Sequence, residues 1–151
     1  MAILRELRYK PVSEWGSPFS FRPNSQLALA ADPGDEAGHA RSLSLFFEIV
    51  APGDAGALHR HTSDEAIFIE DGHLEIRIGE RIEVIGPDDV AFVPQGTPHA
   101  WRNPGPEPIR FRAVFPTDVV EMQLVEDGES DGIGEGPSQI DVRAVLRDGT
   151  R

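Results

Sequence analysis

Short apolar stretches alternate with proline- and glycine-rich turns through most of the middle of this chain. Residues 73–78 and 81–85 each carry an apolar side chain at every second position, and Gly79-Glu80 separates them. Such alternation is typical of strands with one buried face, and a two-residue turn that starts with glycine joins antiparallel neighbours. Strands at short, regular intervals predict an all-β, antiparallel sandwich or barrel. Further strands are predicted over residues 4–9, 25–31, 42–50, 65–70, 89–93, 99–103 and 109–114.

Size and charge narrow the class of protein. At 151 residues, the chain has the size of one domain that can bury a substantial core. Its 14 basic and 26 acidic residues give a net charge of −12, which argues against nucleic acids and anionic membranes as partners. The first fifteen residues lack the apolar core of a signal peptide, and no stretch approaches the length of a membrane span. A cytoplasmic location is therefore expected.

Four side chains are candidate ligands of a metal ion. His59 and His61 are one residue apart, so a strand would place both imidazoles on the same face. Glu65 follows the polar turn Thr62-Ser63-Asp64, and His99 follows a turn built from proline and glycine. The chain has no cysteine, so any metal must take nitrogen and oxygen donors. Imidazoles and a carboxylate on one patch outline a site for a divalent metal.

The two histidine stretches resemble the paired motifs of the cupin superfamily. The first motif of that family runs Gly-x5-His-x-His-x3–4-Glu-x6-Gly, and the second runs Gly-x5-Pro-x-Gly-x2-His-x3-Asn. The leading glycine of the second motif falls on Asp88, with Gly86 two residues earlier, which alters a turn and not a ligand. The matching residues are Gly53, His59, His61, Glu65 and Gly72 in the first motif, and Pro94, Gly96, His99 and Asn103 in the second.

The resemblance implies a small jelly-roll (cupin) barrel with its site in the interior. It implies that His59, His61, Glu65 and His99 bind a divalent transition metal. Fe²⁺ is favoured, while Mn²⁺, Zn²⁺, Ni²⁺ and Cu²⁺ stay open. Four protein ligands leave one or two positions on a five- or six-coordinate ion for water, dioxygen or substrate.

The chain is expected to divide into three parts of one domain. Residues 1–40 would form N-terminal strands or an arm at a dimer interface. Residues 41–118 would form the barrel core with the metal site, and residues 119–151 a C-terminal extension. Within the extension, residues 119–125 would continue the sheet or cover the barrel mouth. Residues 140–146 fit a strand or a short helix equally.

Two side chains are candidate walls of a substrate pocket. Trp101 is two residues from His99 and Ile67 is two residues from Glu65, so in strands each shares a face with a candidate ligand. Plain core packing is an equally good interpretation of both. His39 and His73 are interpreted as solvent or rim histidines. Four aromatic residues are core candidates: Phe46, Phe47, Phe92 and Phe111.

Three functions remain open at this point. Ferrous iron with free coordination positions would suit an oxygenase that acts on a small organic substrate, which is the favoured hypothesis. A redox-neutral isomerase, lyase or polyketide cyclase would use the metal as a Lewis acid. A non-catalytic module would only bind a small molecule. Because cupins are commonly dimers, a homodimer is expected.

Overall fold

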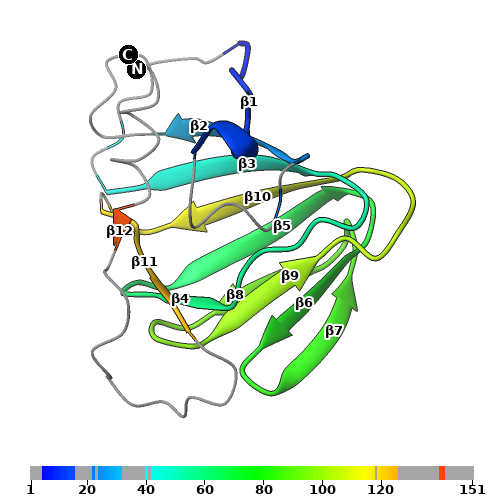
Figure 1. The fold of residues 1–151 in the computed structure, drawn as a ribbon. Helices are drawn as coiled ribbons and strands as arrows, with labels where there is room; N and C mark the ends of the chain where they lie inside the picture. The colour runs from blue at the N-terminus through cyan, green and yellow to red at the C-terminus, as the bar shows by residue number, and fades with distance from the viewer. Residues whose placement is uncertain are drawn as a thin grey trace.

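The computed structural model describes residues 5–15, 22, 24–31, 40, 42–117, 119–125 and 140–141. These residues form two antiparallel sheets that enclose a common interior (Figure 1). One sheet has the order β1-β2-β3-β10-β5-β8, and the other has the order β12-β11-β4-β9-β6-β7. The predicted all-β, antiparallel fold is confirmed. The strands are β1 (Lys10–Pro11), β2 (Gln26–Ala31), β3 (Ser44–Val50), β4 (His59–His61), β5 (Glu65–Asp71), β6 (Leu74–Ile78), β7 (Arg81–Ile85), β8 (Val90–Val93), β9 (His99–Arg102), β10 (Ile109–Phe115), β11 (Glu121–Leu124) and β12 (Ile140–Asp141).

The predicted strand at residues 4–9 is wrong over its described part. Residues 5–9 lie outside any strand, and the chain enters the sheet only at β1, followed by the 3₁₀ turn η1 (Val12–Trp15). Leu4 and Leu7 are three residues apart, so a strand would point them to opposite faces. That spacing cannot supply one buried face, which explains the failure.

The two C-terminal strands extend the second sheet. β11 pairs with β4, and β12 pairs with β11. The prediction that residues 119–125 continue the sheet is therefore confirmed for Glu121–Leu124. For residues 140–146, Ile140–Asp141 is a strand, and the remainder lies outside the described residues, as does His39.

The hydrophobic core lies between the two sheets. In β3, Phe46 and Val50 are buried and alternate with half-buried residues, as period-two alternation requires. Phe111 of β10 and Ile67 of β5, which lie on neighbouring strands, are almost completely buried. The core predictions for Phe46 and Phe111 are thus confirmed, and Phe47 is half-buried on the opposite face of β3.

One core prediction is wrong, and the reason is the position of its strand. Phe92 is 72% exposed. It lies on β8, the edge strand of its sheet, where Ala91 and Val93 occupy the inward positions. Ile82 and Val84 of the edge strand β7 are likewise exposed. Alternation along an edge strand indicates two faces but does not identify the buried one.

Glycine turns connect the strands that carry the motifs. Gly53, Gly72 and Gly96 all have positive φ, a conformation that residues with a Cβ rarely adopt. The turn at Gly86 lacks the expected glycine at position 88. It is closed instead by Asp89, whose carboxylate accepts a hydrogen bond from the Gly86 amide at 2.9 Å. Among the residues described, no helix is long and apolar enough to span a membrane.

Candidate metal centre

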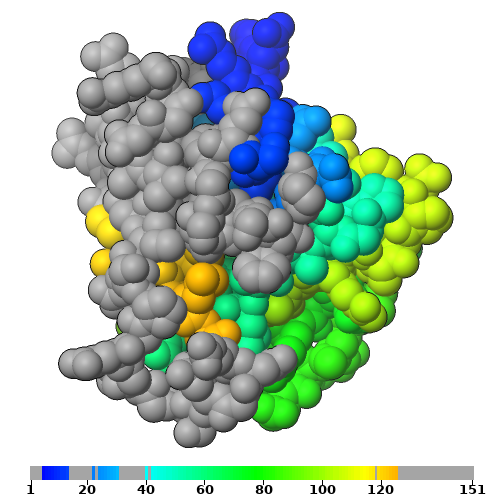
Figure 2. Space-filling model, in the orientation of Figure 1, coloured from blue at the N-terminus to red at the C-terminus, as the bar shows by residue number. Residues whose placement is uncertain are grey.

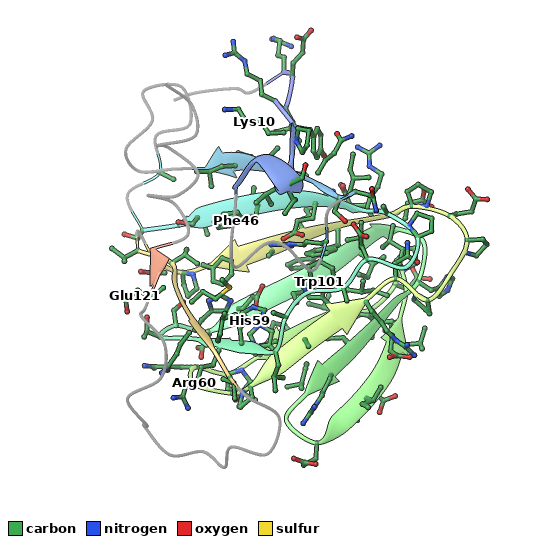
Figure 3. The ribbon with its side chains drawn as sticks, in the orientation of Figure 1. Lys10, Phe46, His59, Arg60, Trp101 and Glu121 are labelled. Atoms are coloured by element: carbon green, nitrogen blue, oxygen red, sulfur yellow. The ribbon has the colours of Figure 1, made fainter. Side chains whose placement is uncertain are left out.

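Three strands bring the candidate ligands into the interior. His59 and His61 are both buried on β4, on either side of half-buried Arg60. His99 begins β9 and pairs directly with His59. Glu65 begins β5 in the opposite sheet. Figure 3 shows His59 between the two sheets, together with Phe46 and Trp101. The structure therefore brings all four predicted residues together.

Each imidazole is fixed by a backbone carbonyl. His59 Nδ1 lies 2.6 Å from the Ala57 carbonyl oxygen, and His99 Nδ1 lies 3.0 Å from that of Thr97. His61 Nδ1 lies 2.7 Å from the carbonyl oxygen of Glu121 in β11. A carbonyl oxygen only accepts, so every Nδ1 must carry the proton. The Nε2 lone pair of each neutral ring is then available to an ion.

The ligand atoms converge on one point. The candidate ligand nitrogens of His59, His61 and His99 lie within 4.8 Å of one another. Glu65 Oε2 lies 2.9 Å from His99 Nε2 and 3.7 Å from His61 Nε2. Glu65 therefore adds one negative charge beside two of the three imidazoles.

Two atoms of this cluster are buried without a hydrogen-bond partner among the described residues. They are Glu65 Oε2 and His99 Nε2, which lie 2.9 Å apart. Buried polar groups of this kind are costly unless something satisfies them. A divalent cation bound to both atoms would do so, and the donor set of imidazole nitrogen and carboxylate oxygen suits a transition metal. The residues present therefore fit such an ion.

Burial and neighbouring charges shift the pKa of all four candidate ligands. Burial, together with the charges of His99 and His61, holds the pKa of His59 well below its usual range. Burial also lowers the pKa of His61, although Glu65 opposes the shift. Burial alone would raise the pKa of Glu65, but the neighbouring His99 and His61 outweigh it and lower the pKa. Burial alone would lower the pKa of His99, but Glu65 raises it.

A cavity of about 630 Å³, counting the space open to solvent at its mouth, adjoins the cluster. Trp101 lines this cavity, and the Gly56 backbone lies so close that a Cβ there would come within 2.7 Å of the indole ring. Ile67 is completely buried in the hydrophobic core and is not among the lining residues. The structure thus places Trp101 at the pocket wall and Ile67 in the core.

Sequence reasoning missed two charged residues of the cavity. Arg22 and Glu48 line it, form a buried ion pair and are each less than a tenth exposed. Glu48 is the one charged residue in the strand Ser44–Val50, which is a signal that could have drawn attention to it. Arg22 comes from outside both motifs, and no spacing rule links it to the histidines. His73 is exposed, as predicted.

Comparisons with known proteins agree with this geometry. Residues 46–115 match the model of the Cupin domain family. Over 70 residues the chain is 43% identical to quercetin 2,3-dioxygenase of Bacillus subtilis, a match that covers 42% of this chain and 20% of that enzyme. The chain therefore spans only about a fifth of that relative.

Solved structures resemble the fold. A Bacillus subtilis oxalate decarboxylase studied for its Mn(II) centres matches 67% of this chain and 28% of its own, with a TM-score of 0.59 and 20% identity. KdgF from Halomonas sp. matches 77% of this chain and 92% of its own, with a TM-score of 0.59 and 18% identity. At these identities the likeness concerns the fold, and it confirms the predicted jelly-roll barrel. The family match, the fold and both motifs agree, and they identify residues 46–115 as a cupin domain.

Proposed function

We propose that this protein is a metal-dependent cupin enzyme, most simply an oxygenase that acts on a small organic substrate. One observation carries the proposal: three buried histidines commit Nδ1 to backbone carbonyls, their ligand nitrogens lie within 4.8 Å of one another, and a buried carboxylate lies beside two of them. His59, His61, His99 and Glu65 would hold the ion, with Fe²⁺ favoured. When bound, ferrous iron would supply the electrons for dioxygen chemistry. The similarity to a quercetin 2,3-dioxygenase supports the oxygenase class.

The protein's own residues have three roles in such a reaction. The carbonyls of Ala57, Thr97 and Glu121 keep the imidazoles in one tautomer and one orientation. Trp101 and the other rings that line the cavity would hold the apolar part of a substrate beside the ion. The barrel walls limit access of water, which strengthens the attraction between Glu65 and a cation.

A redox-neutral enzyme is the second candidate, and one observation favours it. Burial raises the pKa of Glu48 to about 7. The positive charge of Arg22 opposes this shift, and the negative charge of Glu65 adds to it. A carboxyl group of this kind can donate and accept protons near neutral pH. Because Glu48 lines the cavity, it is placed for the proton transfers of an isomerase or lyase.

Oxygen consumption separates the two candidates. Protein reconstituted with Fe²⁺ under argon would be mixed with air-saturated buffer and a panel of substrates that starts with quercetin. We expect dioxygen uptake that depends on both iron and substrate, and we expect the Glu65→Gln variant to show none. Equal turnover under argon, or in protein loaded with Zn²⁺, would rule out the oxygenase and favour the Lewis-acid class.

We also infer a homodimer and a cytoplasmic location. Exposed apolar residues support the dimer: Phe68 pairs with Val90, and Phe92 is the adjacent apolar side chain on the same face of the edge strand β8. Apolar patches of this kind often mark contact sites. Sedimentation velocity at several protein concentrations tests the dimer, and a constant monomer mass would refute it.

A further inference from the structure

The interior contains an ion pair that the fold does not require. Glu48 lies in an inward row of its sheet, and its two direct neighbours in that row, Leu27 of β2 and Phe111 of β10, are buried and apolar. Arg22 donates a hydrogen bond from Nη1 to Glu48 Oε2. Apolar residues of similar volume are often as stabilising as a buried ion pair, because both charges must be desolvated. Stability alone therefore does not explain these two charges.

Arg22 occupies the cavity that holds the candidate metal site. The guanidinium carbon lies 5.0 Å from the centroid of the Trp101 ring, which supports a cation–π contact. The same cavity is lined by His59, His61 and Glu65. The charge of Arg22 is close enough to lower the pKa of both His59 and Glu65. An arginine and a metal site thus share one enclosed space.

The charges of the cavity favour an anion. A divalent ion contributes two positive charges and Arg22 contributes one, whereas Glu48 and Glu65 each contribute one negative charge. With neutral histidines, the loaded cavity would carry one net positive charge inside a wall rich in aromatic rings. A small molecule with one negative charge and an apolar body complements that wall.

We propose that Arg22 is the anion-binding residue of this cavity and binds the carboxylate of a small, apolar carboxylic acid that reaches the metal centre. Glu48 acts as the internal counter-ion that the incoming carboxylate replaces. The guanidinium group can bind a carboxylate through two parallel hydrogen bonds. The inference rests on the proposed function, because it names the substrate class of the same site.

When a carboxylate displaces it from Arg22, Glu48 can become neutral by taking up a proton. Burial already raises the pKa of Glu48 to about 7, so the group can take up a proton near neutral pH when Arg22 turns to the substrate. The swap would leave no unpaired buried charge.

Calorimetry on zinc-loaded protein tests the proposal, since zinc has no redox chemistry that could consume the ligand. The probes are benzoate and benzamide, which share a shape and differ in charge. We expect benzoate to bind at least about 10-fold more tightly than benzamide. We expect Arg22→Gln to weaken benzoate binding about 10- to 100-fold, the usual cost of losing a charged hydrogen bond. Arg22→Lys keeps the charge but loses the paired hydrogen bonds, so its affinity should lie between those of wild type and Arg22→Gln. Glu48→Gln should increase the affinity because the guanidinium group loses its competitor.

A matched pair of variants controls for general effects of charge. Arg112 pairs with Glu70 at a partly exposed position outside the cavity, so Arg112→Gln should leave benzoate binding unchanged. Thermal unfolding of each variant shows that it is folded. The proposal is overturned if wild type fails to bind benzoate at millimolar concentration. It is also overturned if benzamide binds equally well, or if Arg22→Gln and Glu48→Gln weaken binding alike, as a structural ion pair would require.

Zinc content, measured on the same samples, separates this inference from the proposed function. If the Arg22 variants retain zinc but bind benzoate as wild type does, the proposal for Arg22 is refuted and the proposed metal site stands. If no sample holds zinc but benzoate binding still depends on Arg22, the metal proposal fails and the anion site stands.

Discussion

The cupin segment, residues 46–115, and the two segments that flank it contribute differently to the same cavity. The segment supplies all four candidate ligands. The flanking segments supply Arg22, the buried side chains of Val120 and Met122, and the Glu121 carbonyl that fixes His61. In Figure 2 the described N-terminal residues (blue) and β11 (orange) appear on the same face of the molecule. On the proposed function, the ion site would belong to the cupin segment, and recognition of the substrate would depend on the flanking residues.

The largest expected effect is on stability, and it tests whether the N-terminal flanking segment folds together with the cupin segment. Leu27 of β2 is almost completely buried in the common core. We expect Leu27→Ala to lower the free energy of unfolding by about 2–5 kcal/mol, the usual cost of a large-to-small change in a core. Urea unfolding should show one transition at a lower midpoint. Phe92→Ala, at an exposed position, should change stability by no more than about 1 kcal/mol. Equal effects of the two changes, or two separate transitions, would contradict one common core.

The second prediction compares a candidate ligand with a flanking residue. Structural zinc sites bind with roughly 10–16 kcal/mol, so losing one of four ligands should remove about 3 kcal/mol, or about 100-fold in affinity. We expect Glu65→Gln to lose that much in a competition titration with a metal chelator. Met122→Leu, which keeps an apolar side chain in the cavity beside His61, should stay within about threefold of wild type. If Met122→Leu costs as much as Glu65→Gln, the ion site extends beyond the cupin segment.

The third prediction concerns pH and the ion pair that joins the segment to its flank. The pKa of Glu48 is raised from 4.5 to about 7, so the folded protein holds this proton more tightly than the unfolded chain. The resulting stability is fully present below pH 4.5 and is lost as the pH rises through 7, by at most about 3 kcal/mol. In metal-free protein, wild type should therefore lose stability relative to Glu48→Gln between pH 5 and pH 8. Parallel stability curves for the two proteins would show that the Glu48 pKa is not raised.

Contacts within a motif were predictable from spacing, whereas contacts between distant residues were predictable only where a family motif linked them. The spacing of His59, His61 and Glu65 follows from the alternation of strands and one short turn, and His99 joins them through a second motif. Arg22 and Glu48 meet across 26 positions, with no periodic pattern between them. The acceptor for His61 Nδ1 is a backbone carbonyl, which no side-chain pattern can indicate.

Alternation in the sequence locates strands, but it does not show which of their residues are buried, because burial also depends on contacts between distant segments. Alternation located the strands β6 and β7, but the exposure of Ile82 and Val84 depends on β7 having no outer neighbour in its sheet. Phe92 is exposed because it takes an outward position on β8, between the buried Ala91 and Val93. Strand order is set by contacts along the whole chain, so local patterns do not reveal which strands become edges.

The central claim is that His59, His61, His99 and Glu65 together bind one divalent transition metal. Elemental analysis after anaerobic equilibrium dialysis against Fe²⁺, and separately against Mn²⁺ and Zn²⁺, tests it most directly. We predict one ion per chain in wild type, and less than about a tenth of an ion in a His59→Ala, His61→Ala double variant that unfolds at a similar temperature. A folded wild type that retains none of the three metals, or a double variant that still holds one ion per chain, would contradict the claim.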